Sequence, residues 1–440
     1  MSAALSALEE KVIDRVRSSR DELVALATAL IACDTTARTP TDPPRDEARL
    51  QHILEDRLRA LKAETDLWEP EAVEEQNPFM IPAGLSFSGR PQLVARIPGT
   101  GGGPSLLLNG HIDAVDVAPR EQWSSDPFHA EVRDNRLYGR GANDMKGGLA
   151  SLVVALEALQ QAGVRLAGDI VFCSNTDEES SGAGGLAIAS RGIRADAGIC
   201  AEPTGFDIWV ACRGATTGVM SIEGRAGHAE VPQPHWQEGG AVNAIEKTVP
   251  LLQAIQRLRD DWRGRPDCRH ALLSAPSIVP TLIRGGTWLV TYPASCDVTL
   301  DVQYLPRSDE PDPGGRVRAE IMESIAASAA SDPWLREHAP TWQWVSDCPP
   351  AEVPADHPIL AYIRGVSADV GRSSELAGLD SWHDAATFTL FAGTPTVSFG
   401  PGGTETAHAV DEYVPLDDLV DFSSAVAVIA MRWCGVHADS

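Results

Sequence analysis

The sequence predicts an α/β protein whose mostly parallel sheet is flanked by helices and interrupted by a smaller inserted α+β domain. Over the first 211 residues, short apolar stretches typical of buried strands alternate with stretches of helical spacing. Residues 212–347 instead contain alternating strands that suit a sheet with one exposed face. The first pattern then returns. We therefore assign 1–211 and 348–440 to one domain and 212–347 to an insertion.

In the larger domain, helices and strands follow one another in chain order. The expected helices lie within 1–33 and over 48–63, 146–162, 358–370 and 416–435. The expected strands lie within 91–99, 104–113, 168–175, 195–204 and 393–402. Gly163 suits the C-terminal cap of the third helix. Because ligands of such sheets gather beyond the carboxyl ends of the strands, polar residues at those ends deserve most weight.

The insertion has the pattern of a compact domain of normal size, about 135 residues. Its expected strands lie within 215–230, 276–286, 295–306 and 340–350, and its expected helices within 239–262 and 314–330. The glycine pair Gly285 and Gly286 marks the turn between the second and third strands.

Composition and charge exclude several classes of protein. The formal net charge of −26 makes nucleic acid and anionic lipid improbable partners. No apolar run reaches the roughly 18 residues that span a bilayer, and the charged N-terminus does not resemble a signal peptide. We therefore expect a cytoplasmic protein that binds no membrane. The eight cysteines form no C-x-x-C pair, which favours buried reduced thiols over disulfides or zinc knuckles.

The strand predicted within 104–113 ends in His111, Ile112 and Asp113. Residues i and i+2 of an extended segment point to the same side, so Asp113 could accept the ring N–H of His111. Metal-binding histidines commonly have such a carboxylate partner. A histidine at a strand end is nevertheless more often a hydrogen-bonded structural residue, so this pair alone is weak evidence.

Four further segments place acids or a histidine at predicted strand or helix ends. Asp144 lies between glycine-rich turns before a helix, where it could cap that helix or bridge two cations. Glu178 and Glu179 follow a stretch predicted to be a buried strand. Adjacent acidic residues often lie in a solvent-exposed loop, but here one glutamate could bind metal while the other acts as general base. Glu202 and His408 also follow strands. Nitrogen and oxygen ligands without thiolate suit zinc, cobalt or manganese.

In this order, the motifs "GHIDAVDV", "LYGRGANDMKGG", "TDEES", "AEPT" and "AHAVDEYVP" resemble those of one family. It is the acetylornithine deacetylase, succinyl-diaminopimelate desuccinylase and glutamate carboxypeptidase family of di-metal amidohydrolases, and the resemblance covers about residues 23–434. It implies a zinc-exopeptidase-like catalytic domain with two divalent ions, most simply zinc, and with cobalt and manganese as alternatives. The implied metal ligands are His111, Asp144, Glu179, Glu202 and His408. Asp113 would support His111, and Glu178 would be the general base.

The resemblance also implies that the insertion is a lid and dimerisation module. Its "GRAGHAEVP" segment would carry His228 to the active site of the neighbouring subunit in a homodimer, where it would stabilise an oxyanion. Two departures put an α-carboxylate on the substrate in doubt. Val290 replaces an asparagine that contacts substrate in many relatives, and Gln303 replaces a carboxylate-binding arginine.

These departures widen the range of substrates to consider. Arg284 and Arg213 are candidate replacements on position alone, and Trp288 and Trp382 could stack on a ring or serve only in packing. The sequence thus predicts a hydrolase of the amide bond in a small N-acyl compound, including N-formyl compounds on a ring. A dipeptidase or carboxypeptidase is the alternative enzyme. A catalytically dead binding protein is less favoured because every matching residue is chemically competent.

Overall fold

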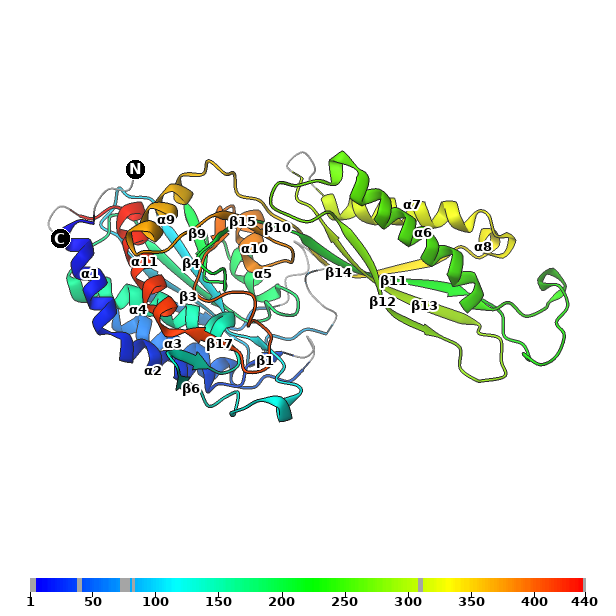
Figure 1. Cartoon of the computed structure of the whole chain (residues 1–440), viewed down its shortest axis with the longest axis horizontal. Helices are drawn as coiled ribbons and strands as arrows, with labels where there is room; N and C mark the ends of the chain where they lie inside the picture. The colour runs from blue at the N-terminus through cyan, green and yellow to red at the C-terminus, as the bar shows by residue number, and fades with distance from the viewer. Residues whose placement is uncertain (1–4, 38–41, 72–79, 81–83, 308–311, 438–440) are drawn as a thin grey trace. The chain divides into compact units, whose positions relative to one another are not determined.

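A computed structural model describes residues 5–37, 42–71, 80, 84–307 and 312–437 (Figure 1). The chain divides into two compact units, each with its own sheet. The first unit consists of Met1–Ala211, Ala351–Gly378 and His383–Ser440. The second consists of Cys212–Pro350 and Leu379–Trp382. The first unit is therefore assembled from three stretches of the chain.

An eight-stranded sheet in the order β15-β10-β16-β9-β4-β8-β3-β2 forms the centre of the first unit. Its strands are β2 (Glu64–Trp68), β3 (Gln92–Ile97), β4 (Leu106–His111), β8 (Ile170–Asn175), β9 (Ala197–Cys200), β10 (Ile208–Cys212), β15 (Leu376–Leu379) and β16 (Thr396–Ser398). The four adjacent strands β16, β9, β4 and β8 are parallel. β10 pairs antiparallel with β16, and β3 pairs antiparallel with both β2 and β8. The predicted mostly parallel sheet flanked by helices is confirmed, and the antiparallel pairs lie outside its four central strands.

Helices cover both faces of this sheet (Figure 1). One face carries α4 (Gly147–Ala162) and α11 (Leu416–Cys434), which are flanked by α1 (Ala7–Ser18), α2 (Arg20–Ile31), α3 (Glu47–Ala60) and α9 (Pro358–Asp369). The other carries α5 (Ala183–Ser190) and α10 (Asp384–Phe391). Helix α4 ends at Gly163, whose φ of 80° is left-handed, as the predicted cap requires. Helix α4 is buried along nearly its whole length, which explains why most of its residues are apolar.

Short strands near the carboxyl ends of the central parallel strands complete the first unit. β1 (Thr36–Ala37) pairs with β5 (Ala114–Val115). A three-stranded sheet contains β6 (Glu131–Arg133), β7 (Arg136–Tyr138) and β17 (Tyr413–Pro415). None of the helices in the described ranges combines the length and the apolar character needed to cross a bilayer. The eight cysteines are free thiols, and seven are buried.

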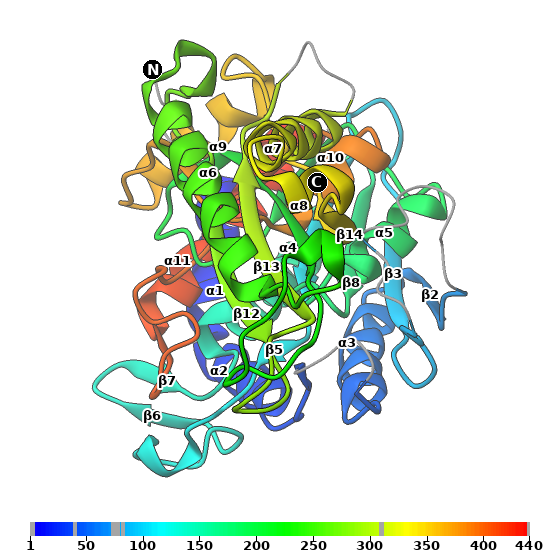
Figure 2. The ribbon, with the colours of Figure 1, turned by 90° about the vertical axis from the view of Figure 1, so that its right-hand side faces the viewer.

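The second unit is a four-stranded antiparallel sheet in the order β12-β13-β11-β14 (Figure 2). Its strands are β11 (Gly214–Glu223), β12 (Ser277–Gly285), β13 (Ser295–Tyr304) and β14 (Thr341–Cys348). Helices α6 (Ala244–Gly264), α7 (Pro313–Ala329) and α8 (Pro333–Glu337) pack on one face. Buried and partly exposed residues alternate along β11, because only one face of the sheet is covered.

Candidate metal centre

The carboxyl ends of three neighbouring parallel strands bring three predicted segments to one edge of the sheet. β4 ends at His111, and Glu202 follows β9 by two residues. The turn after β8 carries Glu178 and Glu179. Because β4 pairs with β8 on one side and β9 on the other, these segments are adjacent. This is the edge where parallel sheets normally bind ligands.

Two loops supply the remaining predicted ligands. Asp144 lies in the turn Ala142–Lys146, directly before α4, and has non-helical backbone angles. The turn begins after Gly141, whose φ of 79° favours glycine. His408 lies in the loop between β16 and β17. The site is therefore assembled from five separate segments of the first unit.

All five predicted ligands come together in two overlapping groups that share Asp144. One group is His111, Asp144 and Glu202, and the other is Asp144, Glu179 and His408. In each group, every residue offers one possible ligand atom, and these atoms all lie within 4.8 Å of one another. His111 Nε2 is 3.1 Å from Asp144 Oδ1, and His408 Nε2 is 3.4 Å from Asp144 Oδ2. The two oxygens of Asp144 thus meet different histidines, as a carboxylate that bridges two cations requires.

Asp113 lies in a different relation to His111 from the one predicted. His111 Nδ1 is 2.9 Å from the main-chain oxygen of Asp113 and 3.6 Å from its carboxylate. The carboxylate instead accepts the main-chain N–H groups of Glu178 and Glu179, at 3.2 and 3.0 Å. Because two peptide donors are closer to this carboxylate than the ring nitrogen is, its first effect is to hold the turn that carries both glutamates.

The electrostatics of the cluster favour the arrival of cations. Burial and the charge of Asp144 raise the pKa of Glu202 to about 8, and burial raises the pKa of Glu178 well above its usual value. Hydrogen bonds to Asp144 and Glu179 raise the pKa of His408 to about 10. Protons therefore compensate the crowded carboxylates in the metal-free protein, and divalent cations can replace those protons. Imidazole nitrogens with carboxylate oxygens suit zinc, cobalt or manganese.

Glu412 is a buried carboxylate that the sequence analysis missed. One of its oxygens accepts the main-chain N–H groups of Asn143 and Asp144, at 2.8 and 3.0 Å. The other accepts from Arg140 Nη1 at 2.7 Å and from the Gly141 N–H at 3.1 Å. Glu412 thereby fixes the turn that presents Asp144, and it lies only four residues after His408. In the sequence it looked like one acid among several in a polar loop.

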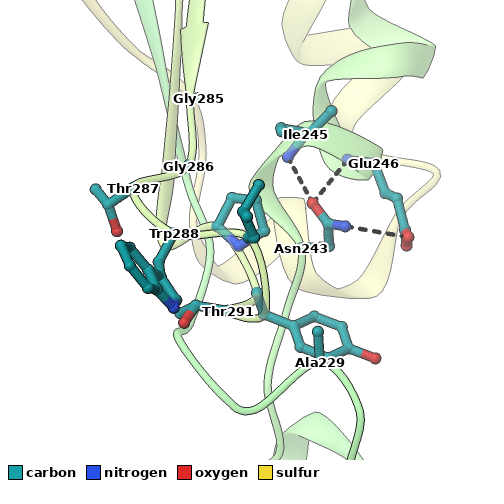
Figure 3. A pocket seen from close by; sticks show the side chains of 12 residues that line it. Ala229, Asn243, Ile245, Glu246, Gly285, Gly286, Thr287, Trp288 and Thr291 are labelled. Atoms are coloured by element: carbon teal, nitrogen blue, oxygen red, sulfur yellow. Dashed lines mark hydrogen bonds between the residues drawn. The ribbon is translucent and has the colours of Figure 1, made fainter.

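The second unit contains His228 and the residues that depart from the family pattern. His228 is exposed, and the loop that carries it pairs with the loop of Val290 and Thr291. Together they border the pocket in Figure 3, which Trp288 and Leu289 also line. The exposed fractions of these two side chains are 70% and 96%. Two neighbouring large apolar side chains therefore project from this loop, where a partner or ligand could cover them.

The candidate replacements for the missing arginine differ in availability. Arg213 donates to the main-chain oxygens of Ala275 and Asp380 and is nearly buried, so its guanidinium is committed within the second unit. Arg284 lies exposed on β12, and Gln303 lies on β13. Trp382 Nε1 donates to the Pro349 oxygen at 3.2 Å, which anchors this indole within the second unit.

Comparison with known proteins identifies the family. Residues 107–432 match the model of peptidase family M20/M25/M40. The chain belongs to peptidase family M20. This confirms the family resemblance found in the sequence motifs. The solved structure of the YXEP protein of Bacillus subtilis, a dinuclear metal-binding peptidase from the M20 family, has the same fold. The TM-score is 0.61 at 16% sequence identity, and the match covers 95% of this chain and 99% of that one.

Two M20 relatives are named for removing an acyl group from a small amine. N-formyl-4-amino-5-aminomethyl-2-methylpyrimidine deformylase of Bacillus subtilis is 27% identical over 435 residues, 96% of this chain and 96% of that protein. Succinyl-diaminopimelate desuccinylase of Stenotrophomonas maltophilia is 30% identical over 337 residues, 72% of this chain and 81% of that protein. The predicted reaction class, hydrolysis of a non-peptide amide by an M20 enzyme, agrees with both names.

Proposed function

We propose that this M20 protein is a di-metal hydrolase that cleaves the amide bond of a small N-acyl compound. The observation that carries the proposal is the pair of ligand groups sharing Asp144. His111, Asp144 and Glu202 would hold one ion, and Asp144, Glu179 and His408 the other. Bound there, zinc, or alternatively cobalt or manganese, supplies a Lewis acid for the amide oxygen and lowers the pKa of water.

Glu178 is the proposed general base. Its carboxylate lies 4.0 Å from His111 Nε2 but belongs to neither ligand group, so it is near the centre without being required as a ligand. A carboxylate in this position can take a proton from water and pass it to the leaving amine. Asp113 supports this role because its carboxylate accepts a hydrogen bond from the main-chain N–H of Glu178 and so positions this residue.

His228 is proposed to donate a hydrogen bond to the oxyanion in the active site of a partner subunit. Its Nδ1 accepts the Glu230 N–H at 3.2 Å, so a neutral ring carries its hydrogen on Nε2. That leaves Nε2 as the donor, which the proposed role needs. His228→Ala should therefore lower kcat more than it raises KM, whereas unchanged kcat would argue against the role.

A homodimer formed through the second unit is supported by an unpaired sheet edge. Strand β12 lies at the edge of its sheet and exposes Val279, Leu282 and Ile283. Ile245 and Val249 are exposed one turn apart on α6, whose first turn lies beside the end of β12. Edge strands with apolar side chains readily pair with a second copy.

The dimer proposal has a matched pair of test substitutions. Leu282→Lys should shift the protein towards monomer in sedimentation experiments, because it places a charge on the proposed interface. Val132→Lys in the first unit is the control, since both side chains are 52% exposed. A monomeric wild type, or equal behaviour of the two variants, would contradict this interface.

The charge of the site favours an uncharged acyl group. Two divalent ions would bring four positive charges to a cluster that also holds the six carboxylates Asp113, Asp144, Glu178, Glu179, Glu202 and Asp384. Among the described residues of the first unit, His111 and His408 contact these carboxylates and are proposed metal ligands, and three further cations nearby are engaged elsewhere. Arg90 pairs with Glu47, Arg140 with Glu412, and Lys146 with the Cys33 oxygen. A succinyl carboxylate would find an unfavourable potential here.

An N-formyl or N-acetyl amine is therefore the preferred substrate class, and an amine on a heteroaromatic ring is the first to test. Two deformylases match nearly the whole chain, which supports the same choice. Trp288 is a candidate for stacking on such a ring. A dipeptidase or carboxypeptidase remains the alternative enzyme, and we place the activity in the cytoplasm.

An activity screen after metal reconstitution tests the proposal. The panel should contain formyl, acetyl and succinyl amides of one aromatic amine, together with dipeptides. We expect the formyl or acetyl amide to be cleaved with the highest kcat/KM. Preferential cleavage of dipeptides would favour the peptidase, and a reconstituted protein without bound metal or activity would favour a dead scaffold.

A further inference from the structure

A row of buried polar side chains crosses the sheet next to the candidate metal centre. Asn109 precedes His111 by two residues on β4, and Cys200 ends β9 two residues before Glu202. Asn175 ends β8, and Asp384 begins α10. The side chains of this row, Asn109, Asn175, Cys200 and Asp384, have no exposed surface. Buried polar groups cost free energy unless hydrogen bonds satisfy them, so their order in the row matters.

Hydrogen bonds join the row from one end to the other. Asp384 accepts a hydrogen bond from Asn175 Nδ2. Asn175 Oδ1 in turn accepts from Asn109 Nδ2 at 2.7 Å. Cys200 Sγ lies 3.0 Å from Asn109 Oδ1 and 3.7 Å from Glu202 Oε1. The row therefore runs from the carboxylate of Asp384 to a proposed metal ligand.

The donor and acceptor groups give the row a direction. Asn175 donates its NH₂ group to Asp384 and therefore turns its oxygen towards Asn109. Asn109 has its NH₂ group towards Asn175 and towards the main-chain oxygen of Cys173, 3.3 Å away, and its oxygen towards Cys200. The thiol has one hydrogen, and this geometry directs it to the nearer oxygen, that of Asn109. Glu202 Oε1 then faces sulfur lone pairs instead of a donor.

We propose that Asp384 is a positioning residue that keeps the Cys200 hydrogen away from Glu202 and so leaves Glu202 available as a metal ligand. The inference deepens the proposed function, since it depends on Glu202 binding an ion. A donor aimed at Glu202 would compete with that ion for the same oxygen. Removing partners that lie behind metal ligands typically lowers metal affinity about 10–100-fold.

Two neighbouring features support the assignment. Helix α5 has Gly185 where it meets Asp384, and a Cβ there would come within 2.5 Å of Asp384 Oδ1. The missing side chain thus makes room for this carboxylate against the helix. Cys200 has no exposed surface, so water offers no other acceptor for its hydrogen. Ser398, which also reaches Cys200, lies 2.6 Å from its own partner, His383 Nδ1.

The test combines two substitutions and measures metal affinity on the full-length protein. Asp384→Leu removes the acceptor and keeps a branched side chain, whereas Asp384→Asn keeps an oxygen that can still accept from Asn175. Asp384→Leu should weaken the binding of one Co²⁺ ion by about 10–100-fold in chelator competition and leave the second ion unchanged, and Asp384→Asn should bind both ions nearly as the wild type does. Adding Cys200→Ala should restore the lost affinity, because the misdirected hydrogen is then absent.

A matched control distinguishes direction from packing. Cys173 is a buried thiol on β8 whose side chain lies in an apolar cluster, so Cys173→Ala should not rescue Asp384→Leu. Thermal unfolding of each metal-free variant checks the fold independently of activity. An Asp384→Leu protein that binds both ions as the wild type does, or that Cys200→Ala fails to rescue, would overturn this inference alone. A wild type that binds no metal would overturn the proposed function as well.

Discussion

Replacing Glu412 by glutamine should destabilise the first unit strongly although it removes only one charge. Glutamine keeps one oxygen, which can still accept from the N–H groups of Asn143 and Asp144. Its NH₂ group would then face Arg140 Nη1 and the Gly141 N–H, which are both donors. The substitution therefore places the glutamine NH₂ group against two other hydrogen-bond donors where water cannot reach them.

The magnitude follows from the burial of both partners. Arg140 is 2% exposed and Glu412 is 1% exposed, so neither side chain can recover its lost bond from solvent. Removing one partner of such a buried pair typically costs about 3–5 kcal/mol. Because the same carboxylate fixes the turn of Asp144, Glu412→Gln should also weaken metal binding by about tenfold or more.

Chemical denaturation of the metal-free protein measures the first effect, and chelator competition measures the second. Glu405→Gln is the matched control, because it makes the same change on an exposed residue of the same loop and should alter stability by less than about 0.5 kcal/mol. If Glu412→Gln lowered the free energy of unfolding by less than about 1 kcal/mol, the reasoning from these four hydrogen bonds would be refuted.

Three further predictions test other parts of the first unit. Glu178→Gln should reduce turnover by about 10²–10⁴-fold while both ions stay bound, because it removes the base and no metal ligand. Metal content and kcat measured on one sample test this, and near-normal turnover would contradict the assignment. His408→Ala should leave one ion per chain, because the group of His111, Asp144 and Glu202 is intact; two tightly bound ions would be inconsistent with the shared site. Burial lowers the pKa of His383 to about 3, whereas an unfolded histidine takes up its proton near pH 6.5. The unfolded state therefore binds more protons between these values, so stability should fall as the pH is lowered from about 6.5 towards 3. His383→Asn should flatten this decline in denaturation curves, and an unchanged slope would show that other groups cause it.

The sequence predicted the centre of the fold better than its edges. The central strands and α4 were recognisable because each is a nearly continuous apolar stretch, as burial on both faces requires. The antiparallel pairing of β10 with β16 depends on contacts between segments nearly 190 residues apart, which no local pattern encodes. The short return of Leu379–Trp382 to the second unit is likewise a tertiary feature.

The candidate site shows the same division between local and tertiary information. The five proposed ligands were found because each follows a strand or precedes a helix and because their motifs occur in family order. The hydrogen bonds of the Asp113 carboxylate to the turn after β8 were missed, since periodicity suggested only its neighbour His111 as a partner. Glu412 and Asp384 were missed because their partners lie more than 200 residues away in the chain.

The unequal exposure of the two histidines gives the centre an inner and an outer position. His111 is 1% exposed, whereas the side chain of His408 is 52% exposed. An ion held by His408 would exchange with its surroundings first, and the inner ion would be released slowly. Under metal limitation, half-loaded molecules should accumulate that carry the inner ion alone. Such molecules would form a reserve that a single incoming ion restores to full activity.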